Sequence, residues 1–330
     1  MIQVGIVGSG FIGPAHIEAL RRLGFVEVVA LCDASLELAQ EKALQLNIPH
    51  AYDDVDALLA HPGLQVVHNC TPNFLHAEVN RQILRAGKHV FSEKPLCMTS
   101  EEARELVKMA QEAGVVHGVS FVYRQFAMVQ QAASMMRDGS AGRLFSAYGG
   151  YHQDWMLLEN DFNWRVDAQQ GGVSRTVADI GSHWCDTVQF VTGRRIVEVM
   201  ADLAIVWPTR KASLGAQATF SEQPDSPGYQ DVPVTTEDAG SVLFRFDDGS
   251  KGCFSVSQVS AGRKNRLHFD INASACSLAW DQETPQQLWI GHRSQPNQLL
   301  SDDPGLLNRD VAAQAHFPGG HNEGWPDAFK

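Results

Sequence analysis

The sequence predicts an α/β protein: a Rossmann domain with a doubly wound parallel sheet, followed by an α+β domain with a mostly antiparallel, open-faced sheet. Residues 1–122 alternate short apolar runs with helical patterns, an order that favours parallel strands joined by right-handed crossovers. A glycine-rich turn follows the first apolar run. After residue 126, β-type runs dominate. We therefore expect one domain over residues 1–123 and a second over 124–330.

Each element of the first domain follows from an apolar run or a helical spacing of apolar residues. The predicted strands are Ile2–Val7, Val26–Cys32, Val66–Cys70, His89–Ser92 and Val116–Val122. The predicted helices are Ile12–Leu23, Leu36–Leu46, Leu75–Ala86 and Glu101–Ala113.

The second domain contains two expected helices, near Val129–Arg137 and Val177–Thr192, among β-type runs. The predicted strands are Leu144–His152, Val197–Leu203, Ser241–Phe246, Gly252–Val259, Leu267–Ile271, Ser277–Trp280 and Gln287–Ile290. An Asp-Gly turn between Phe246 and Gly252 predicts a hairpin. The polar stretch 208–237 predicts a long surface loop of unassigned role. A last helix is expected to begin at Trp325, only a few residues before Lys330.

Composition excludes several classes of partner. The formal net charge is −12, without a basic face that could neutralise phosphates, so nucleic acid is not expected. No apolar run approaches the ~18 residues of a membrane span, and MIQVGIVGSG is typical of a first strand rather than a signal peptide. The cysteines are scattered without metal-ligand spacing, which indicates no metal site and a reduced, cytoplasmic location. They are Cys32, Cys70, Cys97, Cys185, Cys253 and Cys276.

The turn after the first strand is a G-x-G-x-x-G that opens a helix. Gly8 permits the tight turn, Gly10 lets a diphosphate approach the backbone, and Gly13 lets helix and strand pack closely. The N–H groups of the helix start, including those at Phe11 and Ile12, would hold the diphosphate. A glycine turn without a ligand is the alternative.

Asp33 ends the second strand, where a carboxylate can accept hydrogen bonds from a ribose 2′-hydroxyl. A 2′-phosphate would be repelled there, and no arginine follows. NAD is therefore preferred over NADP as the cofactor. A helix N-cap role for Asp33 is compatible with ribose binding.

Three further motifs stand in order along the chain: Cys70-Thr-Pro-Asn-Phe-Leu-His76, Ser92-Glu-Lys-Pro95 and Ala178-Asp-Ile-Gly-Ser-His183. With the glycine loop they make the whole chain resemble the Gfo/Idh/MocA oxidoreductases, which include glucose–fructose oxidoreductase and inositol dehydrogenases. The resemblance implies a cofactor site that also includes Thr71, Pro72, Asn73, His76, Glu93 and Lys94. It also implies that members continue with a C-terminal helix, and the sequence does not separate a shortened chain from one that lacks this helix.

The catalytic candidates are Lys94, Asp179 and His183. A lysine at the carboxyl end of a parallel strand points into the crevice where such sheets bind ligands, and the following proline fixes its direction. Asp179 and His183 are four residues apart on one expected helix, so they share a face. We interpret His183 as the general base, Lys94 as its hydrogen-bonding partner and Asp179 as an orienting group. A solvated lysine, a structural i,i+4 pair or a metal site are the alternatives.

Further polar and aromatic residues are expected to line the site. The resemblance places Trp164 and Arg165 near the nicotinamide. Tyr123, Gln153, Asp154 and Arg175 are predicted to contact substrate, because such groups suit hydroxyl recognition beside a pocket. The alternative for each is a place in the core or in a surface ion pair.

The sequence thus predicts an NAD-dependent dehydrogenase that moves a hydride between nicotinamide and a secondary hydroxyl of a cyclic polyol, a sugar or an inositol. Glycoside cleavage by transient oxidation and a non-catalytic NAD-binding regulator are the alternatives. A homodimer or homotetramer through the open sheet face is expected.

Overall fold

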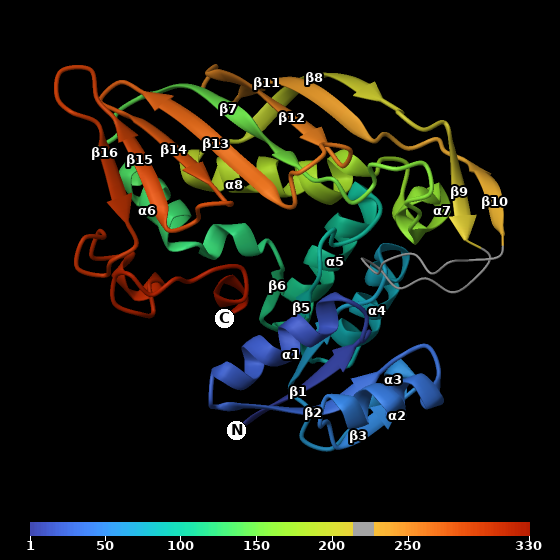
Figure 1. Ribbon diagram of the computed structural model, residues 1–330. Coiled ribbons are helices and arrows are strands. Elements are labelled where there is room, and N and C mark those ends of the chain that lie inside the picture. Colours follow the sequence, from blue (N-terminus) through green and yellow to red (C-terminus); the bar gives the residue numbers. More distant parts are fainter. Residues whose placement is uncertain (214–227) are drawn as a thin grey trace. The chain divides into compact units, whose positions relative to one another are not determined.

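Six parallel strands form the sheet of the N-terminal unit in the computed structural model, which describes residues 1–213 and 228–330 (Figure 1). The strand order is β3-β2-β1-β4-β5-β6. The strands are β1 (Ile2–Val7), β2 (Val26–Cys32), β3 (His50–Tyr52), β4 (Val66–Asn69), β5 (His89–Ser92) and β6 (His117–Val119). Because β1 has β2 on one side and β4 on the other, the order reverses there, and ligands bind at the carboxyl ends of strands at such a point.

Five helices follow these strands, and polar side chains start three of them. They are α1 (Ile12–Arg22), α2 (Leu36–Gln45), α3 (Val55–Leu59), α4 (Asn73–Arg85) and α5 (Ser100–Ala113). Ser35, Asp54 and Thr99 each accept a backbone N–H at the start of α2, α3 and α5. Gly114 ends α5 at φ 64°, a left-handed conformation that glycine adopts without strain.

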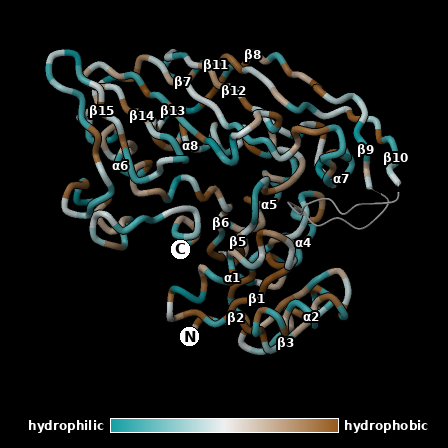
Figure 2. Tube along the Cα trace, in the orientation of Figure 1, coloured by the Kyte–Doolittle hydropathy of each residue, from teal (hydrophilic) through white to brown (hydrophobic). Residues whose placement is uncertain are grey.

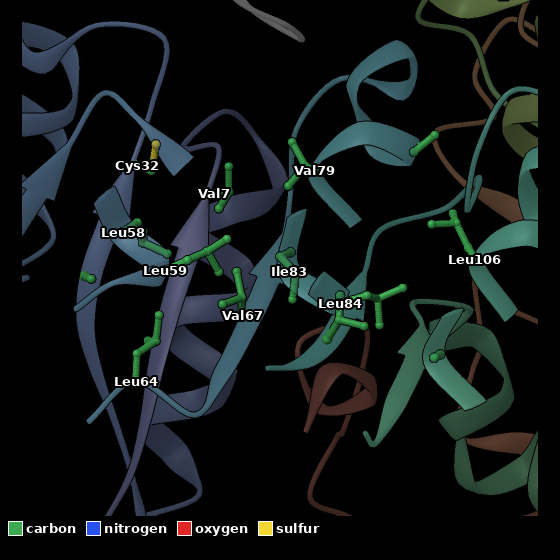
Figure 3. Packing of buried hydrophobic residues seen from close by; sticks show 14 of the residues in the cluster. Val7, Cys32, Leu58, Leu59, Leu64, Val67, Val79, Ile83, Leu84 and Leu106 are labelled. Atoms are coloured by element: carbon green, nitrogen blue, oxygen red, sulfur yellow. The ribbon is translucent and has the colours of Figure 1, made fainter. Parts of the chain in front are cut away.

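The strands of this unit are predominantly hydrophobic (Figure 2). A large cluster packs β1 and β4 against α3 and α4, with Val67 and Ile83 fully buried (Figure 3). Burial on both faces explains the continuous apolar runs from which the strands were predicted. Strand β3 was missed because it is only three residues long and half exposed.

The chain forms two compact units, and each unit consists of segments that are not continuous in the sequence. The first unit comprises Met1–Phe121, Gln169–Gly172 and Phe329–Lys330, and the second comprises Val122–Ala168 and Val173–Ala328. Within the first unit, Nδ2 of Asn73 lies 3.5 Å from the carbonyl oxygen of Gly171.

The second unit contains an eight-stranded sheet in the order β16-β15-β14-β13-β7-β12-β11-β8. All neighbouring pairs are antiparallel except β7 and β12, which are parallel. The strands are β7 (Leu144–His152), β8 (Ile196–Ala204), β11 (Ala239–Phe246), β12 (Lys251–Ser257), β13 (Arg266–Ala273), β14 (Ser277–Asp281), β15 (Gln287–Gly291) and β16 (Gln298–Ser301). The predicted hairpin joins β11 to β12, with Gly249 at φ 83°.

Helices α6 (Ala127–Arg137) and α8 (Ser182–Thr192) pack on one face of this sheet. Inward side chains of β11 and β12, such as Phe244 and Phe254, are buried beside Trp184 of α8. In the described ranges, none of the helices is both long and apolar enough to cross a membrane. All six cysteines are unpaired thiols.

Three local predictions need correction. The stretch 208–237 is not only a loop, because β9 (Thr209–Ser213) pairs antiparallel with β10 (Tyr229–Pro233); residues 214–227 lie outside the described ranges. The strand predicted to reach Val122 ends at Val119, and a 3₁₀ turn (Val122–Gln125) carries Tyr123. The single helix expected over Val177–Thr192 is a π turn (Val177–Gly181) that runs into α8.

Candidate functional site

The glycine loop after β1 has the shape that a diphosphate requires. Gly8 has φ 93°, and a Cβ there would lie 2.6 Å from the carbonyl oxygen of Cys70. A Cβ on Gly13 would lie 2.5 Å from the oxygen of Gly8, so only glycine permits this packing. A Cβ on Gly10 would meet nothing within 4 Å, so a ligand has room at the helix start. The side chain of Phe11 is 58% exposed and that of Ile12 is partly buried.

Asp33, at the end of β2, ties the glycine loop to the second strand. Its Oδ2 accepts hydrogen bonds from the backbone N–H of Ser9 at 2.8 Å and from the Ser9 hydroxyl. Its Oδ1 accepts the N–H of Ala34 at 2.7 Å. These three bonds use both lone pairs of Oδ2 and one of Oδ1, so Oδ1 of Asp33 can still accept one ribose hydroxyl. Ser35, not Asp33, caps α2.

A buried polar chain, not predicted from the sequence, lies beneath the loops after β4 and β5. Asn69 is fully buried, and its Oδ1 accepts the hydroxyl of Thr71 at 2.7 Å. Its amide donates to Asn80 at 2.9 Å, and Asn80 donates to the hydroxyl of Ser92 at 3.0 Å. These bonds fix Thr71, Pro72 and Asn73 at the start of α4 relative to β5.

The Glu93-Lys94-Pro95 segment follows β5, and its Lys94–Pro95 peptide bond is cis. Glu93 is buried, whereas Lys94 is half-buried. The carbonyl oxygen of Pro95 lies 2.5 Å from Nδ1 of His76, and Nε2 of His76 lies 2.7 Å from the carbonyl oxygen of Thr71. The His76 side chain is 1% exposed and lies between these two loops.

In the second unit, two side chains hold the carboxylate of Asp179. Nε of Arg165 lies 3.7 Å from its Oδ1, and the amide of Gln258 donates to its Oδ2 at 2.9 Å. The Arg165 guanidinium also stacks 4.5 Å from the centre of the Trp164 ring. Asp179 is therefore oriented from two sides, within the π turn that precedes α8.

His183 lies in the first turn of α8, next to two buried tyrosines. The ring centres of His183 and Tyr123 are 4.9 Å apart in an edge-to-face arrangement, and that of Tyr151 is 6.3 Å away. The imidazole is 8% exposed. Aromatic edges on two sides restrict the rotation of its ring.

The two tyrosines form a closed hydrogen-bond ring with Asn265. The Tyr151 hydroxyl donates to Oδ1 of Asn265 at 2.5 Å, and Nδ2 of Asn265 donates to the Tyr123 oxygen at 3.0 Å. Tyr123 must then donate to Tyr151, at 2.5 Å. Burial raises the pKa of Tyr123 to about 12 and that of Tyr151 well above its usual value. Both phenols thus stay protonated near neutral pH and do not serve as bases.

Gln153 continues this network, whereas Asp154 turns away from it. Nε2 of Gln153 donates to Oδ1 of Asn265 at 2.7 Å, and its Oε1 accepts the indole N–H of Trp155 at 2.8 Å. Asp154 accepts from Lys264 at 2.8 Å and from the N–H of Gly262 at 3.0 Å. These contacts hold the carboxylate of Asp154 against the segment that contains Gly262 and Lys264.

The substrate role predicted for Arg175 also needs correction. Its side chain is fully buried and forms an ion pair with Asp238. Nη2 of Arg210 lies 2.6 Å from the same carboxylate oxygen, and backbone N–H groups of Val206 and Trp207 donate to the other. Arg175 and Arg210 thus share the carboxylate of Asp238 in the interior of the unit. Because a buried charge is stable only when it is paired, we interpret this cluster as structural.

Each unit therefore gathers its own share of the predicted residues. The first holds Gly8, Gly10, Phe11, Ile12, Gly13, Asp33, Thr71, Pro72, Asn73, His76, Glu93 and Lys94. The second holds Tyr123, Gln153, Asp154, Trp164, Arg165, Arg175, Asp179 and His183. Sequence reasoning missed Asn69, Asn80, Tyr151, Gln258 and Asn265. Among the described residues, no group of three or more histidines, cysteines or carboxylates could hold a metal ion.

Comparison with known proteins matches two family models to successive parts of the chain. Residues 2–121 match a family model described as an oxidoreductase family with an NAD-binding Rossmann fold, and residues 129–279 match the Gfo/Idh/MocA C-terminal domain. A levoglucosan dehydrogenase from Pseudarthrobacter phenanthrenivorans is 30% identical over 302 residues, 89% of this chain and 77% of that protein.

Solved structures with the same fold span the whole chain. A levoglucosan dehydrogenase in complex with NADH and L-sorbose superimposes with a TM-score of 0.90 at 26% identity, over 100% of this chain and 86% of that one. An inositol dehydrogenase homologue from Azotobacter vinelandii, complexed with NAD⁺, gives a TM-score of 0.85 at 28% identity, over 99% and 83%.

Proposed function

Because the chain belongs to the Gfo/Idh/MocA oxidoreductases, enzymes with an NAD-binding Rossmann domain, we propose that it oxidises or re-forms a secondary hydroxyl of a cyclic sugar or polyol. The observation that carries the proposal is the ordered carboxylate of Asp179 one helical turn before His183, in a unit whose relatives act on sugars. NAD, when bound, supplies the hydride acceptor or donor.

The first unit fits this cofactor in detail. Within the glycine loop, a Cβ on Gly8 or Gly13 would meet a backbone oxygen, whereas a Cβ on Gly10 would face open space. N–H groups at the start of α1 would hold the diphosphate. Asp33 would accept a ribose hydroxyl and repel a 2′-phosphate, which favours NAD over NADP.

The chain's own residues would manage the hydroxyl proton. We assign His183 as the group that removes this proton on oxidation and returns it on reduction, since an imidazole titrates near neutral pH. Lys94 would donate a hydrogen bond to the reacting oxygen. Asp179, already held by Arg165 and Gln258, would accept a hydrogen bond from a neighbouring hydroxyl of the substrate.

The side chains around His183 would distinguish sugars. Tyr123 belongs to the ring that Asn265 closes, and Gln153 donates to Asn265, so their polar atoms are fixed before a substrate arrives. Preorganised acceptors and donors recognise hydroxyls at defined positions and reject analogues that leave them unpaired. Trp164, stacked on Arg165, offers an apolar ring face for sugar carbons or for the nicotinamide.

The first experiment is absorbance at the NADH wavelength with NAD or NADP and a panel of inositols, hexoses and anhydrosugars. A rise with NAD and one cyclic polyol supports the proposal. Wild-type rates for the His183→Ala or Lys94→Ala protein would contradict the catalytic assignments. Turnover of a glycoside without net NADH would instead indicate transient oxidation followed by cleavage. A protein that binds NAD and turns over none of the panel would point to a regulator.

We also propose that the protein assembles as a homo-oligomer through the outer face of the eight-stranded sheet. One cross-strand row on this face contains Met200, Leu243, Cys253, Tyr148, Asp270, Ala279, Trp289 and Leu299. Met200 is 66% exposed, Leu243 52% and Leu299 59%. A mostly apolar row of this length, interrupted by Asp270 and exposed in the described part of the chain, supports association with a second copy.

A further inference from the structure

A buried polar cluster in the first unit links helix α1 to the segment that carries Lys94. Nε2 of His16, on α1, lies 3.0 Å from Oε1 of Glu93. Nδ1 of His16 lies 2.9 Å from Nδ1 of His68, on β4. The side chains of His16 and Glu93 are 1% and 9% exposed. The backbone N–H of Lys94 donates to Oε2 of Glu93 at 3.1 Å.

With Glu93 ionised, the geometry allows two arrangements of protons, and burial decides between them. In the first, His16 is an imidazolium that donates to both Glu93 and His68. In the second, His16 is neutral and accepts from Nδ1 of His68. The second pairs the buried, ionised carboxylate of Glu93 with a neutral imidazole and leaves Lys94 as the cation that acts on it, so the charge is less well compensated. The first arrangement pairs the charges and is the one that we adopt.

The titration of the cluster agrees with this arrangement. Burial lowers the pKa of His16, but its contacts with Cys70 and Glu93 outweigh burial and raise the pKa to about 10. Burial and the neighbouring His16 lower the pKa of His68 to about 3. Burial raises the pKa of Glu93, but hydrogen bonding and attraction to His16, together with Lys94, outweigh it and hold the pKa below its usual value. Near neutral pH, His16 is thus charged, His68 is neutral and Glu93 is ionised.

We infer that His16 is a positioning residue for Lys94: it holds one oxygen of the Glu93 carboxylate, while the other oxygen fixes the backbone of Lys94. The rings of Phe91 and Phe329, centred 5.8 Å and 5.2 Å from that of His16, surround the pair with apolar edges. The ion pair therefore joins the helix that follows the glycine loop to the catalytic lysine. The link to catalysis rests on the function proposed above, and the charge state of His16 does not.

The charge state is tested by NMR of ¹⁵N-histidine-labelled protein, with the His16 signals assigned by their loss in His16→Gln. At pH 8 we expect both nitrogens of His16 to carry protons and His68 to be neutral with its proton on Nε2. In Glu93→Gln, His16 should become neutral at this pH. A neutral His16 in the wild-type protein, with a proton on Nδ1 of His68, would overturn the inference even if no substrate were known.

The positioning role is tested with the enzyme and a substrate found by the NADH assay. His16→Gln and Glu93→Gln should each lower kcat on the order of tenfold, because small misplacement of a catalytic group has effects of this size or larger. The Kd for NADH should change less than about threefold. The double variant should lose no more than either single one, since both changes break the same link. His117→Gln, at an exposed position on β6 of the same unit, is the control.

Two results would contradict the positioning role. Additive losses in the double variant would show that His16 and Glu93 act separately. Loss of NADH binding in step with kcat would assign His16 to the folding of the glycine loop.

Discussion

The side-chain amide of Gln258, on the segment after β12, donates a 2.9 Å hydrogen bond to Oδ2 of Asp179 in the π turn before α8. Gln258 is fully buried, and its Oε1 accepts the hydroxyl of Thr176 at 3.2 Å. One end of the amide therefore binds a residue of the π turn, and the other end binds Thr176, the residue just before that turn. This relationship fixes the direction of the carboxylate independently of Arg165.

Replacing Gln258 by leucine should lower kcat on the order of tenfold, because a hydrogen bond to a charged group is worth roughly 1.5–3 kcal/mol. The KM for NAD should stay unchanged, since Gln258 and the glycine loop belong to different units. Steady-state kinetics with a panel-derived substrate measures both constants. Gln111→Leu, at an exposed position on α5, is the control. An unchanged kcat for Gln258→Leu would show that the orientation of Asp179 by Gln258 does not contribute to the rate.

The glycines of the cofactor loop should separate folding from cofactor binding. Gly13→Ala places a Cβ 2.5 Å from the Gly8 oxygen, so we expect a loss of unfolding free energy of about 1–3 kcal/mol. Gly10→Ala meets no protein atom within 4 Å, so its Tm should equal that of the wild type. The same change should weaken NADH binding on the order of tenfold, because the methyl group occupies space that the diphosphate needs. Thermal unfolding and fluorescence titration provide the two readouts; equal Tm losses for both variants would contradict this distinction.

Local sequence motifs predicted the site residues whose chemistry depends on backbone shape. The glycine loop and Glu93-Lys94-Pro95 lie on short segments in which neighbours along the chain create the site. Gln258 and Asn265 escaped prediction because their partners Asp179 and Tyr123 lie 79 and 142 residues away. Distance along the chain also explains the prediction for Arg175. A charged residue just before the helix that carries His183 is typical of a binding pocket, but its partner in a buried ion pair, Asp238, lies 63 residues away.

Asp33→Ser should change the choice of cofactor. The substitution removes an acceptor for the ribose hydroxyl and the charge that repels a 2′-phosphate, so the NAD-to-NADP ratio of kcat/KM should fall by about tenfold or more. Because Asp33 also accepts both hydrogen bonds from Ser9, binding of NAD itself should weaken. Asp56→Ser, an exposed acid on α3, tests whether the overall loss of charge matters. An equal ratio in the Asp33→Ser and wild-type enzymes would refute the ribose assignment.

The outer row of the sheet should govern assembly. Leu243 is 52% exposed and stands opposite Met200 on the edge strand β8, so Leu243→Glu would place a charge within the proposed interface. Burying an unpaired carboxylate is unfavourable, and we expect this variant to sediment as a monomer. Val107→Glu, on α5 of the other unit and 42% exposed, should leave the sedimentation coefficient unchanged. A wild-type protein that sediments as a monomer would contradict the proposed assembly. A Leu243→Glu protein that remains an oligomer would place the interface elsewhere.

A cluster of acidic side chains in the second unit should make stability depend on pH. Burial, with Glu323 and Asp303 nearby, raises the pKa of Asp302 to about 6 from its usual 3.8. Because the folded-state pKa lies above the unfolded one, this carboxyl lowers stability as the pH rises through about 4 to 6, and the loss is complete above that range. Asp302→Asn should therefore raise the Tm at pH 8 and have no effect near pH 3. Asp231→Asn, exposed on β10, is the matched control. A Tm gain of equal size at both pH values would mean that the amide acts through packing rather than through removal of a charge.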